Sequence, residues 1–362
     1  MAALPIRDKR RFGAAGKSGA IDSVRAPISA WGRAGDGTVR PGRATRRPAK
    51  RREPAMTEAT TGRAAVIGLG SMGAGMAASL LRAGFAVAAC DVNPEAVARF
   101  RAAGGTGAGS PAEAASGADV VISVVVNAAQ TEAVLFGEGG AAAAMPEGAV
   151  FVSSATMDPA LARGLAARLE ATGRHYLDAP MSGGAARAAE GGLTFLASGS
   201  AAAFARARPA LDAMAGTVYE LGDAPGQGAA FKMINQLLAG VHIAAACEAM
   251  SFAAKQGLDL ARVYEVITKS AGNSWMFENR VPHILDADYE ARSAVDIFVK
   301  DLGIVQDMAR AERYPVPVAA AALQMFLMAS GAGMGRDDDA SVARVYAQVS
   351  GATLPLPPAA SS

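Results

Sequence analysis

The stretch from Ala64 to Asp91 limits what this chain can fold into more than any other. A short apolar run is followed by three glycines in the spacing G-x-G-x-x-G, a helical pattern, a second apolar run and an acid at its end. The glycines are Gly68, Gly70 and Gly73, and the acid is Asp91. Strand, glycine turn, helix, strand and acid occur in the order that a dinucleotide-binding βαβ unit requires. The stretch therefore predicts such a unit.

Each glycine of this motif has a physical role. Gly68 permits the tight turn out of the strand, Gly70 lets a pyrophosphate approach the backbone, and Gly73 lets the helix pack closely on the strand. The amino end of the helix then offers free N–H groups to the phosphates. We expect the whole loop to bind the cofactor, that is, Gly68, Leu69, Gly70, Ser71, Met72 and Gly73.

Asp91 follows Gly68 at the spacing expected for an acid that binds the adenosine ribose hydroxyls. A carboxylate there would repel a 2′-phosphate, and no arginine follows at once, since Val92, Asn93 and Pro94 come next. Asp91 therefore favours NAD over NADP as the cofactor.

A membrane helix is the alternative interpretation of this region. The 18 residues from Ala64 to Leu81 carry no charge, and a run of this length could span a membrane as a helix. Glycines and serines interrupt the run, and its apolar residues divide into a strand and a helix face. We therefore expect no membrane span.

The charge is unevenly distributed along the chain. Residues 1–55 hold 14 Lys/Arg against 4 Asp/Glu, whereas residues 56–362 hold 21 against 29. The net charge of +2 hides an acidic main part that gives no indication of a nucleic-acid partner.

Residues 1–60 are rich in Arg, Gly, Ala and Pro and show no sustained periodicity, so we expect a disordered extension. No apolar h-region is present, which argues against a secretory signal. A transit peptide and a nucleic-acid tail remain open. We favour a third hypothesis, in which Met56 is the natural initiator and residues 1–55 are not part of the native protein.

Cysteine and histidine are sparse. The two cysteines, Cys90 and Cys247, lie in apolar segments, and the three histidines are scattered. This pattern predicts no disulfide framework and no metal site, and it fits a reducing cytoplasm.

Polar groups follow several predicted strands where each strand ends. The apolar run 119–126 precedes Asn127, a strand ending at Ser153 precedes 154–156, and a strand ending at Ala179 precedes 182–184. Ligands in open α/β sheets bind at the carboxyl ends of the strands. We therefore expect these segments to form one site with the glycine loop.

From Gly226 only helical patterns remain, beginning with a long helix over Gly228 to Gln256. Strands and helices followed by helices alone indicate a separate all-α domain. The predicted fold is α/β, with an N-terminal Rossmann domain (61–225), a long helix into an all-α substrate and oligomerisation domain (226–352), and a tail (353–362).

Two polar groups interrupt the apolar helices of this second domain. Lys232 has Asn235 and Gln236 on its face of the long helix, and Lys300 and Asp301 are adjacent within a later one. A buried lysine is unfavourable unless it loses its charge or gains a partner. Lys232 is either a snorkelling interface lysine or a desolvated lysine suited to proton transfer. Lys300 and Asp301 could form a structural ion pair.

Four segments together resemble the β-hydroxyacid dehydrogenase family, namely GLGSMG, DAPMSGG, GQGAAFKMINQ and FVKDLG. This family includes 3-hydroxyisobutyrate dehydrogenases and tartronate semialdehyde reductases. The resemblance covers about Ala64 to Val349. Within the family, AGNSWMFENRVPHIL and SAVDIFVKDLGIV look most like the L-threonate dehydrogenases, which oxidise a four-carbon sugar acid to its 2-keto acid.

The resemblance implies a role for each matching position. Lys232 matches the catalytic lysine. Substrate-binding positions are matched by Ser182, Gly183, Gly184, Asn235 and Gln236, and either amide could contact the substrate. Positions near the nicotinamide are matched by Val125, Val126, Asn127, Thr156 and Lys300. The family also implies a homodimer or homotetramer.

The predicted activity is NAD-dependent oxidation of a small hydroxy acid, most closely L-threonate, with Lys232 handling the hydroxyl proton. 3-Hydroxyisobutyrate oxidation and tartronate semialdehyde reduction are alternatives within the same class. A non-catalytic Rossmann protein with a nucleic-acid-binding tail is an alternative of another class, and the intact Lys232 and Asn235 argue against it.

Overall fold

The structure is a computed structural model that describes residues 61–356. The predictions made for residues 1–60, including that for Met56, lie outside the described residues.

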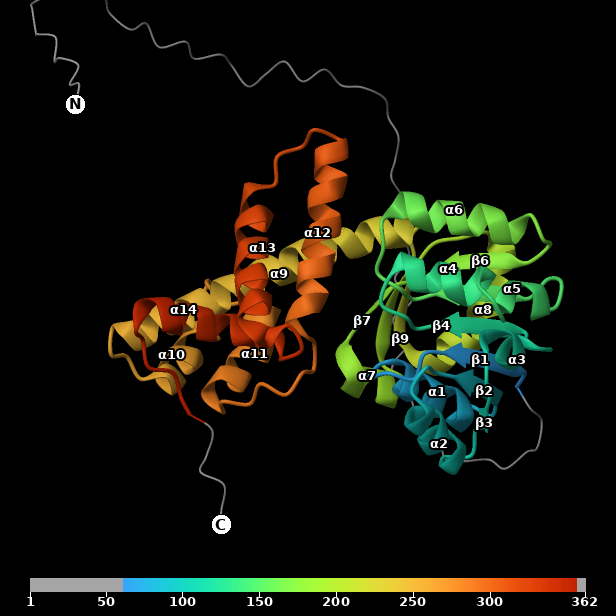
Figure 1. The fold of residues 1–362 in the computed structure, drawn as a ribbon, viewed down its shortest axis with the longest axis horizontal. Helices are drawn as coiled ribbons and strands as arrows, with labels where there is room; N and C mark the ends of the chain where they lie inside the picture. The colour runs from blue at the N-terminus through green and yellow to red at the C-terminus, as the bar shows by residue number, and fades with distance from the viewer. Residues whose placement is uncertain (1–60, 357–362) are drawn as a thin grey trace, which may run out of the picture. The chain divides into compact units, whose positions relative to one another are not determined.

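Six parallel strands form the main sheet, in the order β3-β2-β1-β4-β5-β6 (Figure 1). Their bounds are Arg63–Ile67 (β1), Ala86–Cys90 (β2), Thr106–Gly107 (β3), Val120–Ser123 (β4), Val150–Ser153 (β5) and His175–Asp178 (β6). The order reverses between β1 and β4, which is the Rossmann topology with its ligand crevice at that point. The predicted fold of the first domain is confirmed.

Helices cover both faces of this sheet. The bounds are Gly73–Arg82 (α1), Pro94–Ala102 (α2), Pro111–Ala115 (α3), Ala128–Phe136 (α4), Ala141–Ala144 (α5), Pro159–Glu170 (α6) and Ala201–Met214 (α8). In β1, Ala64 and Val66 share a core with α1, α2 and α8, whereas Ala65 and Ile67 share a core with α3 to α6. Both faces of β1 are thus buried, as its uninterrupted apolar run predicts.

β4 is shorter than the predicted strand over 119–126. It pairs with β1 and β5 only as far as Ser123, which lies beside Ile67 and Ser153. Both neighbouring strands end there, so the following residues have no strand to pair with. They lead instead into α4, which the sequence pattern did not predict because its large apolar residues are confined to its last turn.

A second, three-stranded sheet follows, in the order β7-β8-β9, with β7 antiparallel and β9 parallel to β8. The bounds are Met181–Ser182 (β7), Leu193–Ala197 (β8) and Ala215–Glu220 (β9), with the short helix Gly184–Glu190 (α7) after β7. α7 was also not predicted. This small sheet positions the polar segment that follows β6.

Beyond β9 the described chain is helical. The helices are Gln227–Lys255 (α9), Leu260–Ile267 (α10), Trp275–Leu285 (α11), Val295–Ala311 (α12), Pro317–Ala329 (α13) and Val342–Ser350 (α14), with short turns Ser330–Met334 (η1) and Asp339–Ser341 (η2). α9 packs on β8 and α6 near its start and on α11 to α14 further along (Figure 1). The predicted long helix and all-α domain are confirmed.

Two helical stretches of the described chain, α9 and Pro317–Met334, are long and apolar enough to cross a membrane by length and composition alone. A buried core helix meets the same criterion, and both stretches contribute residues to the core of the helical domain. Ala64–Leu81, by contrast, divides into β1, the glycine loop and α1.

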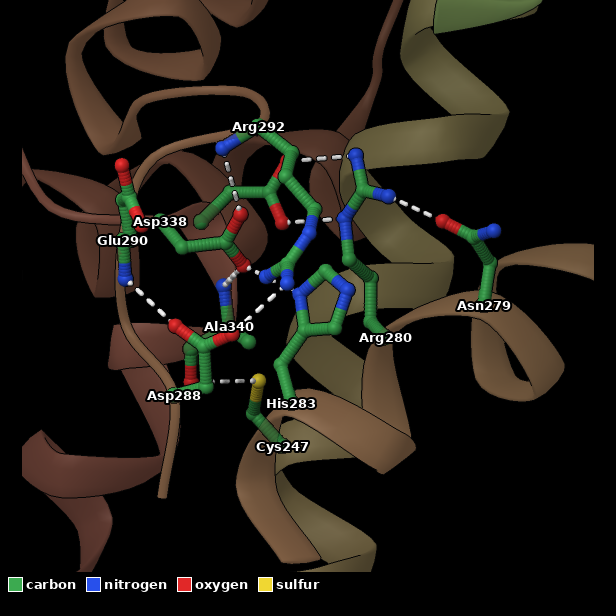
Figure 2. Close-up of polar contacts among 10 residues, drawn as sticks. Cys247, Asn279, Arg280, His283, Asp288, Glu290, Arg292, Asp338 and Ala340 are labelled. Atoms are coloured by element: carbon green, nitrogen blue, oxygen red, sulfur yellow. Dashed lines mark hydrogen bonds and ion pairs between the residues drawn. The ribbon is translucent and has the colours of Figure 1, made fainter. Parts of the chain in front are cut away.

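A buried group of charges joins α11 to the start of η2, which in turn binds the segment before α12 (Figure 2). The guanidinium of Arg280 donates to both carboxylate oxygens of Asp339, at 2.5 and 3.0 Å. His283 Nδ1 lies 2.8 Å from Asp338 Oδ1, and the other oxygen of that carboxylate accepts the N–H of Arg292. Burial raises the pKa of Asp339 to about 6, and Arg280 opposes the rise. The carboxylate is therefore ionised at neutral pH only because its partner is present.

We predict that Arg280→Met strongly destabilises the protein, because Asp339 would be left buried without a partner. The free energy of unfolding should fall by about 3–5 kcal/mol. Arg310→Met is the matched control, since Arg310 pairs with Asp307 on the exposed face of α12 and should lose under about 1 kcal/mol. Urea unfolding at neutral pH measures both changes, and equal small losses would contradict the prediction.

Candidate active site

The glycine loop between β1 and α1 leaves no room for side chains at two of its three glycines. Gly68 has φ +97°, and a Cβ built on it would lie 2.5 Å from the carbonyl oxygen of Val124. A Cβ on Gly73 would collide with the carbonyl oxygen of Gly68. These two glycines therefore set the close approach of α1 to the strand ends, as expected from the sequence.

The third glycine faces open space. A Cβ on Gly70 would meet no atom within 4 Å, so the room that a pyrophosphate would need beside this backbone is present. A pocket of about 310 Å³ adjoins it and is lined by Leu69, Gly70, Ser71, Ala74, Asp91, Asn93, Ala96 and Arg99. These residues fit the adenosine half of a dinucleotide. Met72, the last loop residue before Gly73, is the N-cap of α1.

Backbone groups hold the carboxylate of Asp91 in this pocket. Oδ2 accepts the N–H of Leu69 at 2.5 Å, and Oδ1 accepts the N–H of Asn93 at 2.7 Å. Each oxygen keeps a further lone pair for a ribose hydroxyl. The acid is thus held in a fixed orientation in this pocket, and its binding of a ribose stays a prediction.

Lys300 joins the ends of β4 and β5 to the helical domain. Its Nζ donates to the carbonyl oxygens of Val126, at 2.9 Å, and Thr156, at 3.3 Å. Nζ also lies 2.6 Å from Asp301 Oδ1. The predicted nicotinamide-side positions Val126, Thr156 and Lys300 are therefore brought together.

The other two predicted nicotinamide-side positions are Val125 and Asn127. Val125 is half-buried beside Val126. Asn127 is the N-cap of α4, where its side-chain oxygen accepts the N–H of Gln130 at 2.9 Å. Its side-chain oxygen is thus engaged within its own helix, and its role near the nicotinamide stays a prediction.

The side chain of Lys232 is enclosed, with 8% of the residue exposed. Its Nζ donates to the carbonyl oxygen of Met181 at 2.9 Å. Burial lowers the pKa of Lys232 to about 8, the charge of Lys300 lowers it further, and the charge of Asp301 opposes the shift. An amine with this pKa exchanges protons readily near neutral pH, so the snorkelling alternative is not what the structure shows.

The two amides that follow Lys232 have different surroundings. Gln236 is buried, and its Nε2 donates to Asp301 Oδ2 at 2.5 Å. Asn235 is exposed and donates only to Gln236 Oε1, at 2.9 Å, among the described residues. Gln236 thus holds the acid between the lysines, and Asn235 is the amide available to a ligand.

The segment after Met181 turns sharply. Ser182 pairs with Thr194 in the small sheet, and Gly183 and Gly184 follow with φ +139° and +75°. Side chains are disfavoured at both glycines. The turn therefore begins directly after the Met181 carbonyl that accepts from Lys232, and its role as an anion-binding loop stays a prediction.

Sequence reasoning treated Asp301 as half of a structural ion pair and missed its part in the site. Asp301 is 1% exposed and touches both Lys300 and Gln236. An acid next to a lysine inside an apolar helix was the available signal. The carbonyl of Met181 had no such signal, because any residue could supply it.

The arrangement suits proton transfer at a hydroxyl next to a bound dinucleotide. It provides a buried amine, a glycine turn that follows the carbonyl bound by that amine, and a pocket along the glycine loop. In residues 61–356, no cluster of His, Cys, Asp or Glu could hold a metal ion.

Comparisons with known proteins identify the family. The NAD-binding domain of 6-phosphogluconate dehydrogenase matches residues 63–222, and the NAD-binding domain of NADP-dependent 3-hydroxyisobutyrate dehydrogenase matches residues 226–346. The chain is 59% identical to an L-threonate dehydrogenase of Cupriavidus necator over 281 residues, which is 78% of this chain and 95% of that protein. It is 49% identical to an L-threonate dehydrogenase of Escherichia coli K12, over 80% of this chain and 95% of that protein.

A solved structure agrees with these matches. The crystal structure of a 3-hydroxyisobutyrate dehydrogenase from Salmonella typhimurium is 51% identical, covers 78% of this chain and 99% of its own, and superposes with a TM-score of 0.75. The resemblance seen in the sequence motifs is therefore confirmed, and the chain belongs to the 3-hydroxyisobutyrate dehydrogenase family of NAD(P)-dependent hydroxyacid dehydrogenases.

Proposed function

We propose that this protein oxidises L-threonate to 2-dehydro-L-erythronate with NAD. The observation that carries the proposal is the buried amine of Lys232, held against the anion-binding turn in a chain 59% identical to an L-threonate dehydrogenase. 3-Hydroxyisobutyrate is the alternative substrate, because the similar Salmonella structure is described as a 3-hydroxyisobutyrate dehydrogenase.

In the proposed mechanism, Lys232 accepts the proton of the substrate hydroxyl in its neutral form. The ammonium that results stabilises charge on the substrate oxygen. NAD held by the glycine loop and Asp91 would supply the hydride acceptor for the carbinol carbon. In the reverse direction, Lys232 returns its proton to the carbonyl oxygen.

Other residues orient the acid. Ser182 and the N–H groups of Gly183 and Gly184 bind the substrate carboxylate, and Asn235 binds a substrate hydroxyl. Gln236 acts indirectly, because its amide is already committed to Asp301. Asp301 in turn holds Lys300 at the strand ends.

NAD is the proposed cofactor because of Asp91. Two backbone N–H groups fix its carboxylate, so it cannot easily turn away from a 2′-phosphate bound in the pocket. The negative charges of the carboxylate and the phosphate would repel each other. Arg99 lines the same pocket but lies beside Glu95, 3.9 Å away.

Both cysteines of the described chain are free and buried. This agrees with the cytoplasmic location that we propose.

We predict NADH formation from L-threonate and NAD, with weaker turnover of D-erythronate and 3-hydroxyisobutyrate and weaker use of NADP. Absorbance at 340 nm measures each combination.

We also predict that Lys232→Ala lowers kcat by about 10²-fold or more. Its Kd for NAD, measured by calorimetry, should stay unchanged.

Each result decides a separate part of the proposal. Turnover of 3-hydroxyisobutyrate alone would replace the substrate and keep the mechanism, and a preference for NADP would remove the role given to Asp91. Near-normal turnover by Lys232→Ala would refute the mechanism itself.

We further predict that oxidation gains activity with rising pH through about 8. Below that pH Lys232 is an ammonium and cannot accept the hydroxyl proton, and above it the amine is neutral. The reverse reduction should instead fall above about pH 8. Asp301→Asn should move both limbs to lower pH, because the charge of Asp301 raises the pKa of Lys232. Profiles of kcat against pH test this, and an unmoved limb in Asp301→Asn would contradict the assignment.

We propose a homo-oligomer, for which α9 carries an unpaired apolar stripe. Phe231, Ile234 and Leu238 are 53%, 62% and 49% exposed and recur at helical spacing on one face. An apolar stripe of this kind on a folded chain typically marks a contact surface.

We predict that Ile234→Lys lowers the oligomeric state measured by light scattering. Val266→Lys is the matched control, because Val266 is an exposed apolar residue, at 50%, on α10 and outside the stripe. A wild-type protein that is monomeric at micromolar concentration would rule the oligomer out.

A further inference from the structure

α9 begins without a cap of its own. Its N-cap residue is Gly226, which has φ +105° and no side chain to accept a hydrogen bond. The first N–H groups of a helix have no partner within the helix and need one from elsewhere. α9 is 29 residues long and carries Lys232 in its second turn. The group that binds the first N–H groups of α9 therefore also determines where Lys232 lies.

The partner is a buried carboxylate at the end of β6. Asp178 is 1% exposed, and its Oδ2 accepts the N–H groups of Gly226, at 2.9 Å, and Ala229, at 2.8 Å. Burial raises the pKa of Asp178 to about 6, and the donated hydrogen bonds oppose the rise. The carboxylate is therefore charged at neutral pH, as an acceptor at a helix N-terminus should be.

Ser198, at the end of β8, completes the attachment. Its Oγ accepts the N–H of Gly228 at 2.9 Å and lies 3.4 Å from Asp178 Oδ2. The backbones of Asp178 and Ser198 exchange two hydrogen bonds, at 3.0 and 2.8 Å. The two side chains thus come from a rigid junction between the two sheets.

Gly228 allows the helix to lie this close. A Cβ built on it would collide with the carbonyl oxygen of Leu196 and lie 2.8 Å from that of Asp178. The start of α9 is therefore pressed against the strands, and its depth is set by direct contact as well as by hydrogen bonds.

The same strand end also receives the lysine. Met181, whose carbonyl oxygen accepts from Lys232 Nζ, follows Asp178 by three residues, and Lys232 follows Ala229 by three residues. The contact between Asp178 and Ala229 and the contact between Met181 and Lys232 are thus separated by only three residues on each side. A shift of α9 along or away from β6 would move the amine relative to the Ser182 turn.

We propose that Asp178, together with Ser198, is a positioning residue that sets the location of the Lys232 amine by anchoring the first turn of α9. This inference rests on the proposed role of Lys232.

The test compares Asp178→Ala, Asp178→Asn and Ser198→Ala with wild type, each as the full chain with NAD and the hydroxy acid that wild type turns over best. Asp178→Ala should lower kcat by about 10²-fold, since a displacement near 1 Å has that effect, with Kd for NAD unchanged. Asp178→Asn should recover most of the loss, because a single oxygen accepts both N–H groups. Hydrogen exchange at residues 226–232 should accelerate in Asp178→Ala.

Ser200→Ala is the matched control. Ser200 caps α8, because its Oγ accepts the N–H of Ala203 at 3.2 Å. It should lower the unfolding midpoint without changing kcat or exchange at 226–232.

Unchanged kcat in Asp178→Ala would overturn the inference, and so would an equal loss in Ser200→Ala. If Asp178→Ala fails to fold, Ser198→Ala decides, with an expected loss of about tenfold. Full activity of Lys232→Ala would instead count against the proposed function, so the two failures are distinguishable.

Discussion

The contact between the first turn of α9 and the end of β6 is the constraint on which the site depends. α9 belongs to the helical domain by most of its packing, yet its amino end is bound to the strands of the other domain. A helix of 29 residues is stiff on the scale of a hydrogen bond, so fixing its first turn fixes its second. The position of one amine is thus determined by a junction of two sheets rather than by a loop.

Burying charge is unfavourable, and this chain does it in two places with different results. In the helical domain, Arg280 and Asp339 neutralise each other in a bidentate pair, and nothing in that group is left to react. In the site, Asp301 lies 2.6 Å from Lys300 and influences Lys232 only through its charge. Two lysines share one acid, so one amine keeps a lowered pKa. Burial lowers the pKa of Lys232, and the incomplete pairing leaves that shift only partly opposed, which suits the amine to proton transfer.

The sequence predicts the fold well where local chemistry determines it. The glycine spacing, the position of Asp91 and the long helix each follow from a local sequence pattern, and the structure has all three. Strand lengths were less predictable, because β4 ends where its neighbours end, and the residues after Ser123 are as apolar as those within it. α4 and α7 were missed because short alanine-rich segments carry little periodic signal.

The site was predictable as a set of residues but not as a set of contacts. Lys232, Asn235 and Gln236 are neighbours in sequence, yet the feature that separates the two amides is Asp301, 65 positions beyond Gln236. Likewise, the cap of α9 comes from Asp178, 48 positions before Gly226. Asp178 has no local pattern that distinguishes it from a surface carboxylate, and the only local signal for Asp301 is its place beside a lysine in an apolar helix. Their roles arise only because folding buries them, since a buried carboxylate must find hydrogen-bond donors and therefore determines where those donors lie.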